Sequence, residues 1–271
     1  MSTNTSPAPT RRDFLKKTGG LAAASTLASV VVPRVHAAEN NTIRLALIGC
    51  GARGTGAVAN ALMVNQGPVK LVAMADVFPE VIENRLKYLQ GSIKASWDRT
   101  PTEGLAASID VPPERRFVGF DAYRQAMDCL GPGDVAILAT PPVFRWVHFG
   151  YAIQKGLNVF MEKPLTSDGP TSRRMLKQAE DSIAKNLKVG VGLMSRHSRP
   201  MQELHRRIGD GEIGEILLLR AYRLIGPLAT AFSPRWPGTP SELLWQIQRF
   251  HSFIWASGGC FNDFYIHVID N

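Results

Sequence analysis

The sequence predicts an α/β protein with a doubly wound parallel sheet. Short apolar runs alternate with segments of helical periodicity, which is typical of a parallel sheet covered by helices. The first apolar run leads directly into a glycine-rich turn, and an acidic residue ends the second run. A length of 271 residues suits one large domain or two ordinary ones.

The first predicted strand covers residues 43–48 (IRLALI), an apolar run suited to a strand that is buried on both faces. It is followed at once by a G-x-G-x-x-G turn with Gly49, Gly51 and Gly54, and then by a helical pattern. In such a unit the first glycine permits a sharp turn, the second admits a pyrophosphate, and the third lets helix and strand pack closely. The phosphates would lie at the positive end of the helix. This turn predicts a dinucleotide site.

Asp76 ends a second predicted strand over residues 70–75 and follows Gly54 by 22 residues. The spacing matches that of the acidic residue that binds the adenosine ribose hydroxyls. A carboxylate there favours NAD because it would repel a 2′-phosphate. Arg53 is the loop residue able to pair with such a phosphate, so NADP stays open. Cys50 is expected to fill space in the loop.

Further predicted strands and helices continue to alternate along the chain. Helices are predicted over 121–130 and 145–155, and strands over 135–139 and 158–161. Residues 90–116 form a long, irregular segment with Pro101, Gly104, Pro112 and Pro113, which is interpreted as a surface insertion between strands.

The N-terminus predicts a twin-arginine export signal over residues 1–37. TRRDFLK at 10–16 precedes an uncharged run over 19–32 and a VHA cleavage pattern ending at Ala37. The run of about 14 residues is shorter than the roughly 20 needed to span a bilayer. We therefore expect a periplasmic or otherwise exported protein that contacts the membrane only during export. A disordered Ala-rich terminus or a helical anchor are the alternatives.

The formal net charge of +8 is concentrated in the predicted signal. Residues 1–37 carry five basic and one acidic side chain, which leaves +4 for the remainder. This scattered charge does not indicate nucleic-acid binding. Three cysteines without metal-type spacing predict neither a disulfide framework nor a zinc site.

Two motifs follow later strands. Thr140-Pro141-Pro142 comes after the strand ending at 139, and Glu162-Lys163-Pro164 after the strand ending at 161. Ligands bind at these carboxyl ends in open α/β sheets. Together with the glycine turn and Asp76, the segments ATPP and VFMEKPLT resemble the Gfo/Idh/MocA oxidoreductases over residues 42–271.

The resemblance implies a cofactor-binding Rossmann domain over 38–165, with Thr140, Pro141 and Glu162 as further cofactor contacts. It also implies an α/β substrate domain over 166–271 whose open sheet carries the oligomer contacts. In that domain helices are predicted over 170–184 and 201–208, strands over 188–193 and 217–224, and a last helix from 257–259 onward.

The chain ends soon after this last helix, whereas members of the family continue. Two convincing strands make a marginal sheet. We therefore expect an incomplete second domain, a chain that is poorly stable and inactive alone, and a homo-oligomer for a full-length form.

The resemblance assigns chemistry to three residues. Lys163 would lie beside the nicotinamide, where partial desolvation lowers a lysine pKa and suits it to general acid–base catalysis. Asp263 and His267 are four residues apart and share a helix face; the histidine would contact the reacting hydroxyl and the acid would orient it. Glu162 would orient Lys163 or contact the cofactor. Tyr265 departs from the small residue that many members carry there.

Other histidines and acids receive weaker interpretations. Asp263, His267 and Asp270 could hold a divalent metal, but one helix face rarely suffices, so no metal is predicted. The remaining histidines are expected to be structural: His148, His197, His205 and His251. Four aromatic residues precede the site and could stack on sugar faces, although packing is the favoured interpretation: Trp236, Trp245, Phe250 and Trp255.

The sequence thus predicts an NAD- or NADP-dependent oxidoreductase that takes a hydride from a hydroxyl of a sugar, polyol or cyclitol. Export implies that the cofactor is loaded beforehand and held tightly. One alternative is a redox-neutral glycosidase, lyase or epimerase of the same family. Another is a non-catalytic or degenerate nucleotide-binding protein, because the chain looks truncated.

Overall fold

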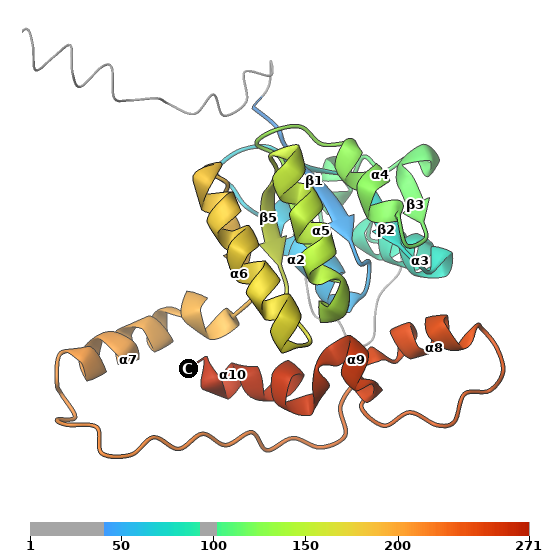
Figure 1. Cartoon of the computed structure of the whole chain (residues 1–271). Helices are drawn as coiled ribbons and strands as arrows, with labels where there is room; N and C mark the ends of the chain where they lie inside the picture. Colours follow the sequence, from blue (N-terminus) through green and yellow to red (C-terminus); the bar gives the residue numbers. More distant parts are fainter. Residues whose placement is uncertain (1–40, 93–101, 271) are drawn as a thin grey trace, which may run out of the picture. The chain divides into compact units, whose positions relative to one another are not determined.

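The computed structural model describes residues 41–92 and 102–270, and a six-stranded parallel sheet lies at its centre (Figure 1). The strand order is β3-β2-β1-β4-β5-β6, and every neighbouring pair is parallel. The strands are β1 (Ile43–Ile48), β2 (Val69–Asp76), β3 (Arg116–Val118), β4 (Val135–Leu138), β5 (Asn158–Met161) and β6 (Val189–Val191). The predicted Rossmann-type fold is confirmed.

Helices cover both faces of the sheet. In Figure 1, α4 (Ala122–Asp128), α5 (Pro142–Lys155) and α6 (Gly169–Ala184) lie in front of it. The other face packs against α2 (Ala52–Leu62), α3 (Pro79–Leu89) and the 3-10 helix Leu105–Ser108. The carboxyl ends of the strands therefore open onto one edge of a three-layer sandwich, where the candidate site residues lie.

Strand β1 shows why a mainly apolar run suits this position, with Arg44 near its exposed start as the exception. Leu45 and Leu47 pack on the side of α2 and α3, whereas Ala46 and Ile48 pack on the side of α4 and α5. All four are at most 2% exposed. Because side chains alternate along a strand, a central strand needs apolar residues at each position where helices cover both faces.

The segment 90–116 is more than the predicted surface insertion. Its residues 93–101 lie outside the described part of the chain, but Leu105 and Val111 are buried in the core beside α2 and α3. Ile109 forms a parallel bridge with Leu71, and β3 then starts at Arg116. Pro112 and Pro113 begin a 3-10 turn, Pro113–Arg115, that leads into β3. Strand β3 escaped prediction because it is three residues long and Val118 is exposed.

The sheet continues beyond the expected domain boundary at Leu165. Strand β6 pairs with β5, and α6 packs on α5, so the helix and strand assigned to the second domain belong to the first sheet. The prediction misplaced them because a sequence pattern does not specify which sheet a strand joins.

The C-terminal part is mainly helical. It comprises short 3-10 segments at Met194–His197 and Phe250–Ser252, and the helices α7 (Arg199–Gly209), α8 (Glu242–Gln248), α9 (Ile254–Ser257) and α10 (Ile266–Ile269), with a π-helical turn at Phe261–Tyr265.

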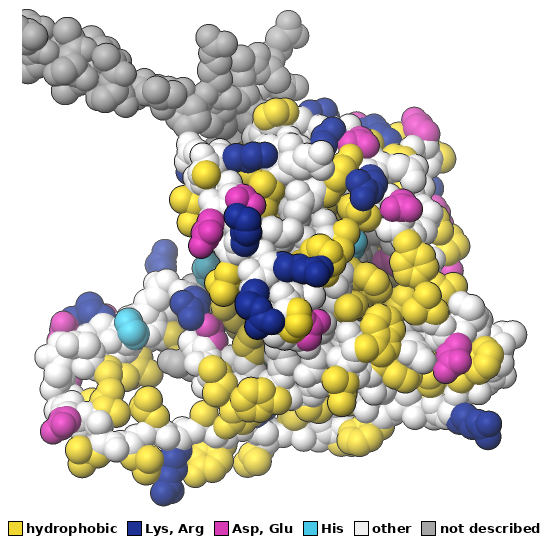
Figure 2. Space-filling view, viewed as in Figure 1, with side chains coloured by type: hydrophobic (Ala, Val, Ile, Leu, Met, Phe, Trp, Pro, Cys, Tyr) yellow, Lys and Arg dark blue, Asp and Glu magenta, His cyan; other side chains and the backbone are white. Residues whose placement is uncertain are grey.

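The predicted strand over 217–224 does not form. Within the described residues no strand follows β6, and Leu217, Leu219 and Leu224 are more than four-fifths exposed. Hydrophobic side chains are visible along the lower part of the view in Figure 2, where this segment runs. A strand needs a neighbour for its backbone N–H and C=O groups, and the described residues form no second sheet that could supply one.

The predicted export signal over 1–37 lies outside the described residues. Between residues 41 and 270, leaving aside 93–101, no helix is long and apolar enough to cross a membrane.

Asp134 fastens the start of β4 to β1. Its buried carboxylate accepts hydrogen bonds from the N–H of Arg44 (3.0 Å), the Arg44 Nε (2.8 Å) and the N–H of Gly131 (2.8 Å). All three partners are donors, so a carboxylate suits the place and an amide NH₂ does not.

We expect Asp134→Asn to lower the free energy of unfolding by about 2 kcal/mol, since one acceptor oxygen becomes a donor facing donors. Urea denaturation of the full chain measures the loss. Asp181→Asn is the matched control, because Asp181 is exposed and its pair with Lys177 is 4.0 Å long; it should change stability by less than about 0.5 kcal/mol. Equal effects of the two substitutions would contradict the role of Asp134.

Candidate functional site

The glycine turn after β1 has three glycines with three different surroundings. Gly49 has a φ of +88°, and a Cβ there would lie 2.6 Å from the backbone N of Thr140. At Gly54 a Cβ would lie 2.2 Å from the carbonyl oxygen of Gly49. At Gly51 a Cβ would meet nothing within 4 Å. Two glycines are therefore required by the fold, whereas the third leaves open space over the start of α2.

That open space belongs to a cavity of about 250 Å³ at the carboxyl ends of β1, β2 and β4. Five predicted cofactor residues line it: Gly49, Gly51, Asp76, Thr140 and Pro141. Aromatic side chains form much of its wall, and Ile247, Gln248 and Phe250 from the C-terminal part close one side. The other predicted cofactor residues lie outside this lining: Arg53, Gly54, Glu162 and Lys163.

Asp76 lies on the cavity wall and accepts a hydrogen bond from the backbone of the glycine turn. Its Oδ2 accepts the N–H of Cys50 at 2.7 Å, and its Oδ1 accepts the N–H of Phe78 at 3.1 Å. Burial raises the pKa of Asp76, while these N–H groups oppose the rise. Because a carboxylate has about four acceptor positions, Asp76 retains capacity for the hydroxyl groups of a ligand in the cavity.

Arg53 points toward β5 and not toward Asp76. Its guanidinium lies 2.6 Å from Oε1 of Glu162, the residue that follows β5. Strands β2 and β5 lie on opposite sides of the β1–β4 pair, so this contact directs Arg53 away from the end of β2. The expectation that Arg53 could receive a 2′-phosphate beside Asp76 disagrees with this geometry. The sequence could not show the pair, which joins residues 109 positions apart.

Arg145 is a buried residue that the sequence reasoning missed. It lies on α5 and donates to the backbone carbonyls of Thr140, which follows β4, and of Glu162, which follows β5. Burial lowers its pKa to about 10. Arg145 thus links the two strand ends that carry the ATPP and EKP motifs. The position of Arg145 on the apolar face of α5, in line with Phe149 and Ala152, is the sequence feature that could have predicted its burial.

His148 lies one turn further along α5 and lines the cavity. Its Nδ1 is 3.2 Å from Oγ1 of Thr140, and its ring contacts Tyr123 with centroids 4.4 Å apart. Burial, and then the nearby Arg145 guanidinium, lower its pKa from 6.5 to about 3. The ring is therefore neutral in the folded protein at neutral pH.

The His148 pKa predicts a loss of stability in acid. The unfolded histidine binds a proton below pH 6.5 and the folded one does not until about pH 3, so unfolding is favoured as the pH falls between these values. From pH 7 to pH 5 this group should remove about 2 kcal/mol of stability. Urea denaturation at both pH values should show a smaller loss for His148→Gln than for the unchanged protein. Equal losses would contradict the assignment.

Lys163 and Asp263 come together although 100 residues separate them. Lys163 Nζ donates to the backbone oxygen of Asp263 at 2.7 Å and to its Oδ1 at 3.1 Å. Asp263 is buried in the π-helical turn, and its Oδ2 has no hydrogen-bond partner in the described structure. The Lys163–Pro164 peptide is cis. The structure therefore pairs the predicted lysine with the predicted acid.

His267 does not join this pair directly. In the described part of the chain no hydrogen bond or ion pair connects it to Asp263 or Lys163, although it is near enough for Lys163 to affect it. Burial, followed by Lys163 and Arg223, lowers the pKa of His267. The π-helical turn widens the helix between residues 263 and 267, so the four-residue spacing does not bring the two side chains into contact.

The metal alternative has no support. Asp263 pairs with Lys163, and Asp270 pairs with Arg196 at 2.6 Å. Over 41–92 and 102–270 no group of three His, Cys, Asp or Glu side chains could hold a metal ion.

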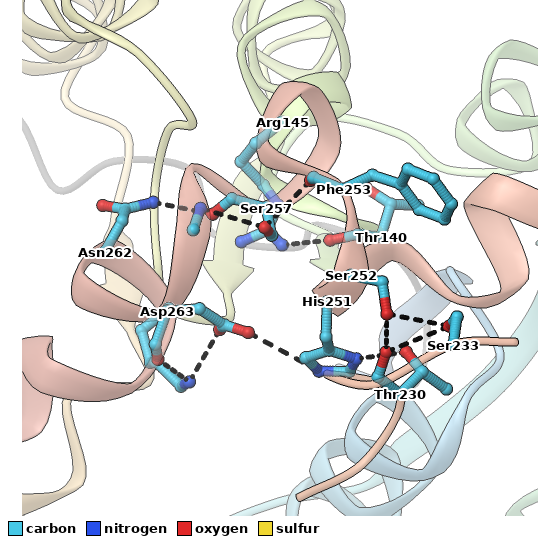
Figure 3. Close-up of polar contacts among 12 residues, drawn as sticks. Thr140, Arg145, Thr230, Ser233, His251, Ser252, Phe253, Ser257, Asn262 and Asp263 are labelled. Carbon is cyan, nitrogen blue, oxygen red and sulfur yellow. Dashed lines mark hydrogen bonds and ion pairs between the residues drawn. The ribbon is translucent and has the colours of Figure 1, made fainter.

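His251, and not His267, is the histidine that lies against the Asp263 carboxylate. Its Nε2 lies 3.5 Å from Oδ2 of Asp263, and its Nδ1 lies 2.9 Å from Oγ1 of Thr230 (Figure 3). The ring stacks on Phe264 with centroids 5.7 Å apart. Sequence reasoning left His251 among the structural histidines because it comes from a different turn than Asp263, and no spacing rule joins them.

The aromatic residues before the site mostly pack. Trp245 is buried, and the indole N–H groups of Trp236 and Trp255 donate to Pro240 O and to Gln246 Oε1. Phe250 lines the cavity and its ring lies 3.9 Å from that of His251. Phe250 therefore connects the wall of the cavity with His251.

No family model matches the chain. Among curated proteins it is 28% identical over 181 residues to an inositol 2-dehydrogenase of Rhodococcus jostii, covering 66% of this chain and 41% of that protein. It is 37% identical over 121 residues to inositol 2-dehydrogenase 4 of Saccharopolyspora erythraea, covering 44% and 33%. The chain resembles inositol 2-dehydrogenases. It spans less than half the length of either relative.

Solved structures show a similar overlap. Myo-inositol 2-dehydrogenase from Lactobacillus plantarum is 24% identical with a TM-score of 0.49, over 65% of this chain and 43% of that one. Scyllo-inositol dehydrogenase from Lactobacillus casei, solved with NAD(H) and scyllo-inositol, is 22% identical with a TM-score of 0.47, over 64% and 43%.

Proposed function

We propose that this chain belongs to the Gfo/Idh/MocA oxidoreductases, binds a nicotinamide dinucleotide in the cavity at the strand ends, and serves the oxidation of a polyol hydroxyl. The observation that carries the proposal is the glycine turn whose bare Gly51 opens into a cavity beside Asp76. Similarity to inositol 2-dehydrogenases supports the substrate class.

The residues present fit such a cofactor. A pyrophosphate needs bare backbone at a helix start, and Gly51 precedes α2 with nothing in the space where a side chain would project. Asp76 has acceptor capacity left for ribose hydroxyls. Its carboxylate would repel a 2′-phosphate, and Arg53 is engaged by Glu162. We therefore propose NAD as the preferred form.

Lys163 is the proposed proton acceptor. When bound, the nicotinamide ring supplies a hydride acceptor for the substrate carbon, and the hydroxyl proton must go to a base. Lys163 follows β5 and is 17% exposed, and two hydrogen bonds from its Nζ to Asp263 fix its position. Asp263 thus orients Lys163, and we propose that half-buried His267 contacts the substrate.

Equilibrium binding and turnover test the proposal. Titration of the full chain with NAD⁺ and NADP⁺, followed by calorimetry, should show tighter binding of NAD⁺. Nicotinamide absorbance should then report oxidation of myo-inositol or scyllo-inositol. Absence of any dinucleotide binding by the folded chain would refute the proposal; binding without turnover of any polyol tested would refute the activity and keep the site.

We further propose that residues 1–37 direct export and that the nucleotide travels with the folded protein. Soluble NAD is not expected outside the cytoplasm, so a retained cofactor would have to be regenerated in place. Mass spectrometry of protein recovered from the periplasm should find bound nucleotide, whereas an Arg11→Lys, Arg12→Lys double variant should stay in the cytoplasm. Unchanged export of that variant would contradict the signal.

A further inference from the structure

Asp263 lies between two basic groups. One carboxylate oxygen, Oδ1, is 3.1 Å from Lys163 Nζ, and the other, Oδ2, is 3.5 Å from His251 Nε2 (Figure 3). The carboxylate is only 5% exposed, and Oδ2 has no other polar partner in the described structure. The predicted site residues do not include His251, and the proposed function gives it no role.

The burial of Asp263 limits when Lys163 can lose its proton. A buried carboxylate is costly unless a cation accompanies it. If Lys163 is to accept a proton it must first be a neutral amine, and Asp263 then loses its cation. Among the described residues, His251 is the other group in contact with Asp263 that can become positively charged.

We propose that Lys163 and His251 share one proton across Asp263, so that His251 is the positioning residue that makes neutral Lys163 accessible. One form has an ammonium at Lys163 and a neutral His251; the other has an amine at Lys163 and an imidazolium at His251. The cluster has the same net charge in both forms, and Asp263 always faces one cation. The inference rests on the proposed role of Lys163 as proton acceptor.

The contacts of His251 suit both of its forms. Thr230 Oγ1, 2.9 Å from Nδ1, can donate to a neutral ring and accept from an imidazolium. The Thr230 carbonyl in turn accepts the Ser252 hydroxyl, which holds this segment in place. The rings of Phe250 and Phe264 flank the imidazole and carry no charge. Burial lowers the pKa of His251; of the ionised groups that act on it, Asp263 raises the pKa and Lys163 lowers it.

Each proton can be accounted for over the oxidation of one substrate hydroxyl. The substrate O–H bond breaks, and its proton forms a bond to Lys163 Nζ. The His251 imidazolium, whose side chain is 19% exposed, then releases one proton to solvent. Transfer of a proton from Lys163 to His251 restores the starting form. One proton leaves for each hydroxyl oxidised.

Histidine NMR tests the coupling without any turnover. In the full chain labelled with ¹⁵N-histidine, the His251 signal is the one lost in His251→Gln. Its pKa should rise by about one unit or more in Lys163→Met, which removes the competing cation, and should fall by a similar amount in Asp263→Asn. A His251 pKa that moves by less than about 0.3 unit in Lys163→Met would overturn the proposal.

The pH dependence of turnover gives the second readout. His251→Gln keeps a donor near Asp263 but cannot take the charge, so loss of activity in acid should begin about one pH unit or more higher, with kcat reduced at neutral pH and KM little changed. His251→Phe, which keeps the ring stack, should behave alike if the glutamine variant folds poorly. His205→Gln, at an exposed site on α7, is the matched control.

The two proposals fail differently. A wild-type chain that binds no nucleotide or oxidises no polyol defeats the proposed function, while the NMR titration still decides the coupling. Normal turnover with an unshifted profile in His251→Gln defeats the coupling and leaves the function standing.

Discussion

Replacing Lys163 with methionine is expected to lower kcat for polyol oxidation by about 10²- to 10⁴-fold, the usual contribution of a positioned general base. Methionine keeps the length and packing of the side chain but accepts no proton. Because Lys163 lies outside the lining of the cavity, NAD⁺ affinity should change by less than about threefold, which is under 1 kcal/mol. Steady-state kinetics and calorimetry on the same preparation separate the two effects.

Removal of Lys163 also leaves Asp263 without its hydrogen-bonded cation, so stability must be followed. Thermal unfolding of Lys163→Met and of the double variant Lys163→Met, Asp263→Asn distinguishes a folding defect from a chemical one. Lys87→Met, at an exposed position on α3, serves as the lysine control. A Lys163→Met protein with undiminished kcat would remove Lys163 from the reaction.

A pair of glycine substitutions should separate folding from nucleotide binding. At Gly54 an added methyl group lies 2.2 Å from the Gly49 carbonyl oxygen, and neither backbone segment can move without disturbing the sheet. We expect Gly54→Ala to cost about 3 kcal/mol of stability or to prevent folding. At Gly51 the same methyl meets no protein atom, and φ is −61°, so the fold should tolerate alanine to within about 0.5 kcal/mol.

Gly51→Ala should nevertheless weaken NAD⁺ binding by about tenfold or more, because its methyl group projects where a pyrophosphate would contact bare backbone. Urea denaturation and calorimetric titration of both variants measure the two quantities. Nucleotide binding by a stable Gly51→Ala protein at the original affinity would place the ligand elsewhere.

The sheet was predictable where local pattern and burial agree. The bounds of β1 and β5 were predicted to the residue, and those of β2 and β4 to within one, because the buried part of a central strand is apolar on both faces. Strand β3 was missed because it is short and partly exposed. Strand β6 was assigned to another sheet, and the strand expected over 217–224 did not form, because pairing partners are decided by the fold and not by the segment itself.

The candidate site likewise has residues that the sequence predicted and residues that it did not. The glycine turn and Asp76 could be predicted since a single βαβ unit of consecutive sequence carries both. Lys163 and Asp263 were chosen only by family resemblance, which paired Asp263 with His267, whereas the structure joins Asp263 to Lys163 across 100 residues. His251 and Arg145 were missed because their partners, Asp263 and two backbone carbonyls, are defined only once the chain is folded.

The Arg145 contacts with the ends of β4 and β5 have a consequence for how this site can change in evolution. Both acceptors are main-chain carbonyls, which every amino acid possesses, so the fastening does not depend on which side chains stand at positions 140 and 162. Those side chains can be exchanged to suit another ligand while the strands stay joined. Selection or a designer can therefore vary these two side chains without breaking the Arg145 link, although exchange of Glu162 also removes the carboxylate that pairs with Arg53.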